Sequence, residues 1–254
     1  DQSEILATLQ QLAEMYQRLE RPSDEIRVWE RIYELSPELI FGDSNILLQL
    51  EHRYGTSGRH AEQASLLQRA LSRVDRPVSK LGPSDADHKR QLLLRLGQVQ
   101  HEFLQASAEA TRTFEKVLIE WPEDRTALTA LVSLQSQGDP TELKRHLNDL
   151  LKLVQEPTER SRYLFQLGEL LDKLGEADNA YRLYGEAFSL DAANRAAFTA
   201  YERACYRRQQ WTEALKIYET ALRLIETQKT RSYRPADLHL RRGQVQLQYL
   251  QQVD

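Results

Sequence analysis

The hydrophobic positions of this chain recur with the spacing of α-helices, and the clearest example lies between residues 161 and 194. Apolar side chains repeat at i, i+3 and i+7 in the first half of this stretch, and at i, i+4 and i+7 in the second half. These residues are Leu164, Leu167 and Leu171, followed by Ala180, Tyr184 and Ala187. Gly175 separates the two halves, so the pattern predicts a hairpin of two helices. A hairpin of this size cannot bury both of its apolar faces alone and needs similar units on either side.

The paired pattern recurs along most of the chain. It predicts full repeats at 3–37, 38–75, 88–122, 123–157, 158–193 and 194–227, and a half repeat at 236–254. Ser3 is predicted to cap the first helix. An irregular connection is expected at 75–87, where Pro77, Gly82 and Pro83 interrupt the helical spacing. The chain is therefore predicted to be a single array of helical hairpins.

These hairpins resemble the tetratricopeptide repeat, a helix-turn-helix unit of about 34 residues. The family pattern has large, small and aromatic residues at fixed offsets. In the stretch from 161 to 194 those positions hold Leu164, Leu167, Gly168, Leu171, Ala180, Tyr184 and Ala187, while Ala192 replaces the usual proline. The first repeat matches with Leu9, Leu12, Ala13, Tyr16, Trp29, Ile32 and Pro37. The resemblance implies an all-α fold, a right-handed α-solenoid of antiparallel helix pairs.

The arrangement is similar to the long tetratricopeptide arrays of bacterial multidomain proteins, which serve in secretion, polysaccharide export, motility and signalling assemblies. The resemblance implies a non-catalytic scaffold or adaptor that binds a partner protein or peptide in a concave groove lined by the first helix of each hairpin. The partner-binding residues that it places in this groove are Arg162, Phe165, Glu169, Lys173, Arg203, Tyr206 and Arg207. Exposed aromatic and arginine side chains commonly anchor protein interfaces.

The net charge adds little to this prediction, but the distribution of charge differs between the two ends of the chain. The net charge is −4, which gives no overall attraction to nucleic acid or to acidic membranes. Residues 1–51 contain four basic and eleven acidic side chains, whereas residues 195–254 contain eleven basic and six acidic ones. The basic end favours an acidic partner. It also leaves open a nucleic-acid-binding helical repeat, because Arg195, Arg203, Arg207, Arg208, Arg241 and Arg242 gather there.

Motifs for catalysis or cofactor binding are absent from the sequence. There is no Gly-Lys-Ser/Thr phosphate loop, no Gly-x-Gly-x-x-Gly, no His-Glu-x-x-His and no Gly-x-Ser-x-Gly. The six histidines show no metal-binding spacing, and His52 and His60 are expected at the surface. The single cysteine, Cys205, is expected to be a small buried residue rather than a nucleophile. We therefore expect no enzymatic activity, no cofactor, no metal and no small-molecule substrate.

Three further expectations concern context. No apolar run is long enough for a membrane-spanning helix, so membrane insertion is not expected, and a cytoplasmic location is favoured with the periplasm left open. The half repeat at 236–254 is a candidate for self-association, because its apolar face would lack a following helix. The chain is also compatible with a regulatory segment of a larger enzyme or of a secretion or motility assembly.

Overall fold

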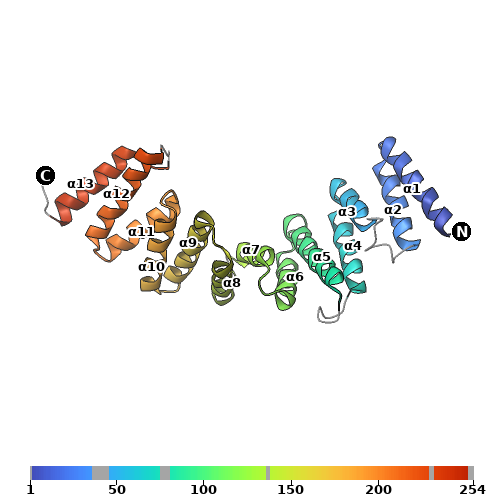
Figure 1. Ribbon diagram of the computed structural model, residues 1–254, viewed down its shortest axis with the longest axis horizontal. Helices are drawn as coiled ribbons and strands as arrows, with labels where there is room; N and C mark the ends of the chain where they lie inside the picture. The colour runs from blue at the N-terminus through green and yellow to red at the C-terminus, as the bar shows by residue number, and fades with distance from the viewer. Residues whose placement is uncertain (1, 36–45, 75–80, 136–137, 229–231, 251–254) are drawn as a thin grey trace. The chain divides into compact units, whose positions relative to one another are not determined.

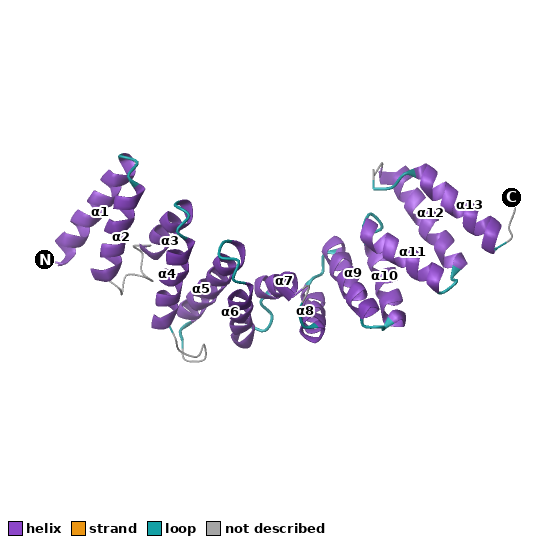
Figure 2. Ribbon diagram, turned by 180° about the vertical axis from the view of Figure 1, so that it is seen from behind, coloured by secondary structure: helices purple, strands orange, loops and turns teal. Residues whose placement is uncertain are grey.

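The computed structural model describes residues 2–35, 46–74, 81–135, 138–228 and 232–250. Within these ranges the protein is built from helices and contains no strand (Figures 1 and 2). The predicted all-α fold, a solenoid of antiparallel helix pairs, is thereby confirmed. The expectations placed on Pro37, on residues 75–80 of the irregular connection and on residues 251–254 lie outside the described residues.

Thirteen helices follow one another in the described part of the chain. They are α1 (Gln2–Arg18), α2 (Pro22–Leu35), α3 (Ile46–Thr56), α4 (His60–Arg73), α5 (Pro83–Glu102), α6 (Ser107–Glu120), α7 (Arg125–Leu134), α8 (Pro140–Leu153), α9 (Pro157–Lys173), α10 (Ala177–Leu190), α11 (Arg195–Arg207), α12 (Trp211–Gln228) and α13 (Pro235–Tyr249). They form two compact units, Asp1–Leu134 and Gln135–Asp254. The division falls inside the predicted repeat 123–157, and the limits of the individual repeats remain predictions.

Five hairpin turns share one backbone arrangement. Each contains a residue with positive φ, which reverses the chain after the first helix. These residues are Glu20, Gly58, Gln105, Gly175 and Gln209. In each turn an amide just beyond this residue donates back to a carbonyl near the end of the first helix, at 2.8 to 3.0 Å. The bonds join Arg21 to Tyr16, Arg59 to Tyr54, Ala106 to Gln100, Glu176 to Leu171 and Gln210 to Cys205. The hairpins are therefore closed by local bonds.

Two helices of the C-terminal unit begin with an acidic cap. Asp139 caps α8 by accepting from the Thr141 amide at 2.9 Å, and Glu156 caps α9 in the same way. Helix α5 begins earlier than predicted, because Pro83 occupies its first turn, where a missing amide hydrogen costs nothing. The cap assigned to Ser3 is wrong, since Ser3 lies inside α1.

Glycines let the two helices of a hairpin approach closely. A Cβ atom added at Gly97 in α5 would lie 2.7 Å from the Phe114 ring of α6. One added at Gly168 in α9 would lie 2.6 Å from the Tyr184 ring of α10. Both rings are buried, so each fills the space that its glycine leaves open. The Leu-Gly and aromatic positions of the sequence pattern thus form the contact between the two helices.

Candidate functional site: a charged groove between α9 and α11

The predicted binding face of the C-terminal unit contains a groove of about 610 Å³. Helices α9 and α11 supply its walls, and Tyr184 of α10 lies between them. The lining side chains that carry polar or aromatic groups are Phe165, Glu169, Asp172, Lys173, Tyr184, Arg195, Thr199, Arg203 and Arg207. Both walls are first helices of hairpins, as the family resemblance implies for a concave groove.

Positive charge exceeds negative charge among these residues. Arg207 reaches across from α11 and pairs with Asp172 of α9 at 2.8 Å, and this contact raises the pKa of the guanidinium. Lys173, Arg195 and Arg203 make no ion pair with any residue in the described part of the chain. Glu169 is the other carboxylate in the lining. The groove can therefore accept an anionic group from a ligand without first breaking an ion pair.

Tyr184 belongs both to the packed contact between α9 and α10 and to the lining of the groove. Its ring is buried against Gly168 and lies 6.1 Å from the Phe165 ring. Burial, followed by the charges of Asp172 and Glu169, raises the pKa of Tyr184 to about 12. The hydroxyl thus stays protonated at neutral pH and can act as a hydrogen-bond donor.

Five of the seven predicted partner-binding residues line this groove: Phe165, Glu169, Lys173, Arg203 and Arg207. Arg162 lies outside it, over the Tyr163 ring at 5.0 Å and 3.6 Å from Glu159. Tyr206 also lies outside. It packs edge-on against Trp211 at 5.2 Å, and its hydroxyl is 3.2 Å from that of Tyr218.

The family pattern predicts only a packing role for Tyr184, because it places an aromatic residue at that position. The signal that could have placed it in the groove is its hydroxyl, since a purely buried position would suit phenylalanine. Arg195 was noted only for its charge. It opens α11, and this position brings it into the lining.

The basic cluster at the C-terminal end is partly neutralised within the unit. Arg207 pairs with Asp172, Arg208 pairs with Asp178, and Arg241 pairs with Glu202 at 2.7 Å. Half of the six clustered arginines therefore have carboxylate partners. Of the three clustered arginines without an ion pair in the described part of the chain, Arg195 and Arg203 line the groove, whereas Arg242 lies outside it.

The residues considered for other chemistry occupy packing positions. Cys205 is fully buried, and burial raises the pKa of its thiol to about 12, which keeps it protonated. His146 is buried with Nδ1 2.8 Å from Gln135 Oε1. Within the described ranges no three His, Cys, Asp or Glu side chains lie close enough to hold a metal ion together. No helix in those ranges has the length and apolar character needed to span a membrane.

Comparison with known proteins supports the same fold. Residues 197–232 match the tetratricopeptide repeat family. The crystal structure of MamA protein is similar with a TM-score of 0.54 at 17% identity, over 75% of this chain and 96% of that chain. A tetratricopeptide repeat protein from Parabacteroides merdae ATCC 43184 is similar with a TM-score of 0.50 at 17% identity, over 95% of this chain and 86% of that one. No curated protein matches the sequence. The predicted likeness to tetratricopeptide repeat proteins is confirmed.

Proposed function

We propose that this chain is a non-catalytic interaction scaffold that holds an acidic segment of a partner protein in the groove between α9 and α11. The observation that carries the proposal is the groove lining, in which Lys173, Arg195 and Arg203 surround an aromatic base without ion-pair partners in the described part of the chain. Tetratricopeptide repeats typically serve as protein-interaction modules, and this supports a binding role rather than a catalytic one. The preformed groove lowers the ordering cost of binding, because its walls are packed helices.

The ligand that fits combines an apolar side chain with carboxylates. Phe165 offers apolar surface, while the arginines offer forked donors that match carboxylate geometry. The Tyr184 hydroxyl adds one neutral donor at the base of the groove. Such a segment would associate faster at low ionic strength, because the groove attracts it before contact.

The decisive experiment measures affinity for a partner obtained by affinity capture with the whole chain and identified by mass spectrometry. The variant Arg195→Ala/Arg203→Ala should weaken binding by about 2 kcal/mol in titration calorimetry if these residues are hot spots. A matched control, Arg18→Ala/Arg223→Ala, removes two exposed arginines outside the groove and should leave the affinity unchanged. Equal affinity for both variants would show that the partner uses another surface.

The nucleic-acid alternative makes a different prediction for the same variants. A nucleic-acid ligand would show affinity falling steeply and linearly on a logarithmic salt scale, with a slope set by the number of phosphates contacted. The pairing of Arg207, Arg208 and Arg241 with carboxylates leaves few cations for such contacts. A duplex or single-stranded oligonucleotide that bound with this salt slope would favour the alternative.

Self-association through α13 is a second candidate, favoured by one observation. Leu240 and Leu247 are 63% and 62% exposed, whereas Leu238 and Val245 of the same helix are buried. Large exposed leucines one heptad apart lie on a single helix face that another chain could cover. The variant Leu240→Lys/Leu247→Lys should convert a dimer into a monomer in light scattering, and a monomeric parent chain would eliminate this candidate.

A further inference from the structure

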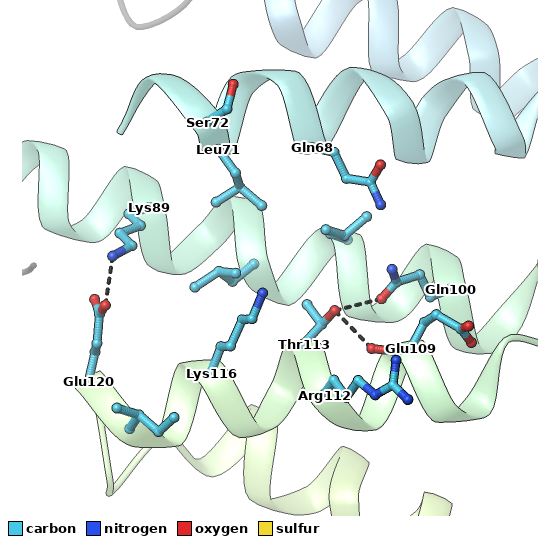
Figure 3. Close-up of a pocket in the computed structure, with 13 residues that line it drawn as sticks. Gln68, Leu71, Ser72, Lys89, Gln100, Glu109, Arg112, Thr113, Lys116 and Glu120 are labelled. Carbon is cyan, nitrogen blue, oxygen red and sulfur yellow. Dashed lines mark hydrogen bonds and ion pairs between the residues drawn. The ribbon is translucent and has the colours of Figure 1, made fainter. Parts of the chain in front are cut away.

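A second pocket lies in the N-terminal unit, where α5 runs between α4 and α6 (Figure 3). Its volume is about 550 Å³. The walls are second helices of hairpins, so the pocket is built differently from the groove between α9 and α11, whose walls are first helices.

The floor of this pocket is apolar. Leu71 of α4 and Leu93 and Leu96 of α5 form it, and the two α5 leucines are largely buried by their neighbours. Ile119 of α6 stands at the edge with 78% of its surface exposed. An apolar side chain entering the pocket would remove the exposed surface of Ile119 and the remaining exposed surface of Leu71 from water. Such burial is the main source of affinity in small pockets.

One end of the floor carries a donor group on a largely buried side chain. Gln100 is only 6% exposed, and its Oε1 accepts a hydrogen bond from the Thr113 hydroxyl at 2.7 Å. That bond leaves the Nε2 hydrogens available, and Nε2 has no hydrogen-bond partner in the described part of the chain. Figure 3 shows the amide of Gln100 directed toward the pocket.

The other end carries a buried acceptor. The Lys89 ammonium donates to Glu120 Oε1 at 2.6 Å, while Glu120 Oε2 is buried without a hydrogen-bond partner among the described residues. A buried carboxylate oxygen without a donor raises the free energy of the empty pocket. On either side of its apolar floor the pocket thus has a donor on a largely buried side chain and a carboxylate with one buried oxygen that lacks a donor.

Two cationic side chains of α6, Lys116 and Arg112, line the pocket between and beside its two polar ends. Figure 3 shows Lys116 reaching from α6 toward the middle of the pocket, and Arg112 stands one turn earlier on the same helix. Neither cation makes an ion pair in the described ranges. Lys116 is therefore free to pair with a carboxylate that a ligand supplies.

The spacing selects the form of the ligand. Lys89 and Gln100 are eleven residues apart on α5, and a rise of about 1.5 Å per residue separates them by roughly 16 Å. About five residues of extended chain cover this length. An extended backbone also keeps free amide and carbonyl groups for Glu120 and Gln100, whereas most of those in a helix are already bonded to one another.

We propose that the pocket between α4, α5 and α6 binds a short extended segment of a partner protein. Its central apolar side chain packs on Leu71, Leu93 and Leu96, and a neighbouring carboxylate pairs with Lys116. Backbone groups of the segment satisfy Gln100 and Glu120. This proposal does not depend on the groove between α9 and α11, and the chain would carry two separate peptide sites if both proposals hold.

The test selects ligands from a displayed library of random dodecapeptides on the intact chain, followed by fluorescence anisotropy of labelled peptides. Peptides with an apolar residue next to Asp or Glu should be recovered. Their dissociation constants should rise at least tenfold for Arg112→Glu/Lys116→Glu. Truncation of the exposed floor edge, Ile119→Ala, should raise them severalfold with an unchanged helical spectrum.

Two matched variants make the result decisive. Arg18→Glu/Arg223→Glu changes the net charge equally at exposed arginines outside both sites, and it should leave these affinities within twofold of the parent value. Arg195→Glu/Arg203→Glu alters only the groove. If every recovered peptide loses affinity in the groove variant and none does in Arg112→Glu/Lys116→Glu, this inference is overturned while the groove is supported. Failure to recover any saturable peptide sensitive to Lys116 would also overturn it.

Discussion

The α5–α6 hairpin of the N-terminal unit and the α9–α10 hairpin of the C-terminal unit are built on the same contact but expose different chemistry. In each, a glycine of the first helix receives an aromatic ring of the second: Phe114 at Gly97, and Tyr184 at Gly168. Phe114 ends inside the core. Tyr184 adds a hydroxyl that lies in the lining of a charged groove. The repeat pattern therefore determines where the aromatic rings pack. The tyrosine hydroxyl, which phenylalanine lacks, determines whether the residue can also contact a ligand.

The two units also share an ion pair at matching positions of adjacent first helices. Glu51 of α3 pairs with Arg95 of α5 at 2.6 Å, and Glu202 of α11 pairs with Arg241 of α13 at 2.7 Å. Glu51 and Glu202 each follow a core residue directly, at the position that glycine holds in the α5–α6 and α9–α10 hairpins. Arg95 and Arg241 each lie two residues before the glycine of a Gly-Gln-Val-Gln sequence. The two units thus join adjacent first helices by the same ion pair. The pairs differ in burial, since the Arg241 side chain is 45% exposed and that of Arg95 is 29% exposed.

The strongest test of the shared glycine contact replaces the glycines with leucine. Gly97→Leu and Gly168→Leu should each overpack a buried ring and lower the free energy of unfolding by about 1–3 kcal/mol. Gly243→Leu is the control, because no atom lies within 4 Å of the position its Cβ would take. Chemical denaturation followed by circular dichroism measures the difference. A Gly168→Leu variant as stable as Gly243→Leu would contradict the packing described for α9 and α10.

The two ion pairs should differ in strength when the arginine is removed. Arg95→Ala leaves the carboxylate of Glu51, which is 10% exposed, without its cation, and should cost about 2 kcal/mol. Arg241→Ala should cost less than about 1 kcal/mol, because the arginine is half exposed and the Tyr218 hydroxyl still donates to Glu202 at 2.6 Å. Hydrogen exchange of α3 and α11 measures each effect locally. Equal losses of protection would show that burial does not separate the pairs.

Tyr206 and Arg203 separate packing from binding within the C-terminal unit. Tyr206→Ala removes edge contacts to Trp211 and Tyr249, and should lower stability by about 1 kcal/mol. Arg203→Ala removes an exposed groove cation and should change stability by less than about 0.5 kcal/mol. Thermal melting of the two variants checks this. A destabilised Arg203 variant would mean that the groove cations also hold α9 and α11 together.

The smallest expected effect is a pH dependence at Glu51. Burial raises the pKa of this carboxyl above 4.5, and the charge of Arg95 offsets part of the increase. The folded state then binds more protons than the unfolded state just above pH 4.5, so this group lowers stability as the pH rises through that range. Glu51→Gln lacks the titration. The stability of the parent relative to this variant should therefore fall as the pH rises from 4 toward neutrality, and a pH-independent difference would exclude the effect.

Most of the helical framework could be predicted from the sequence, because it depends on local periodicity. Leucine spacing predicted α9, and the alanine and tyrosine positions predicted α10. Sequence patterns missed the helical role of Pro83, because the same proline that ends one helix pre-organises the first turn of another.

The groove could be predicted only in part. The family resemblance placed Phe165, Arg203 and Arg207 on the groove side of first helices, and the structure brings them into one lining. It could not separate Tyr206, because that side chain packs against Trp211 of the next helix and Tyr249 of α13. The sequence pattern also did not reveal the pocket between α4, α5 and α6. That pocket depends on how three helices pack together, which local spacing does not determine.

The hairpin turns have a consequence for how the chain folds. Each of the five turns is closed by a bond between backbone groups only five or six residues apart, so native contacts form before distant parts of the chain must meet. Proteins dominated by such short-range contacts fold in microseconds to milliseconds. Repeat arrays can also begin folding at any sufficiently stable hairpin and spread outward. Folding of this chain should therefore start independently in its two units, with the α9–α10 hairpin as one nucleus.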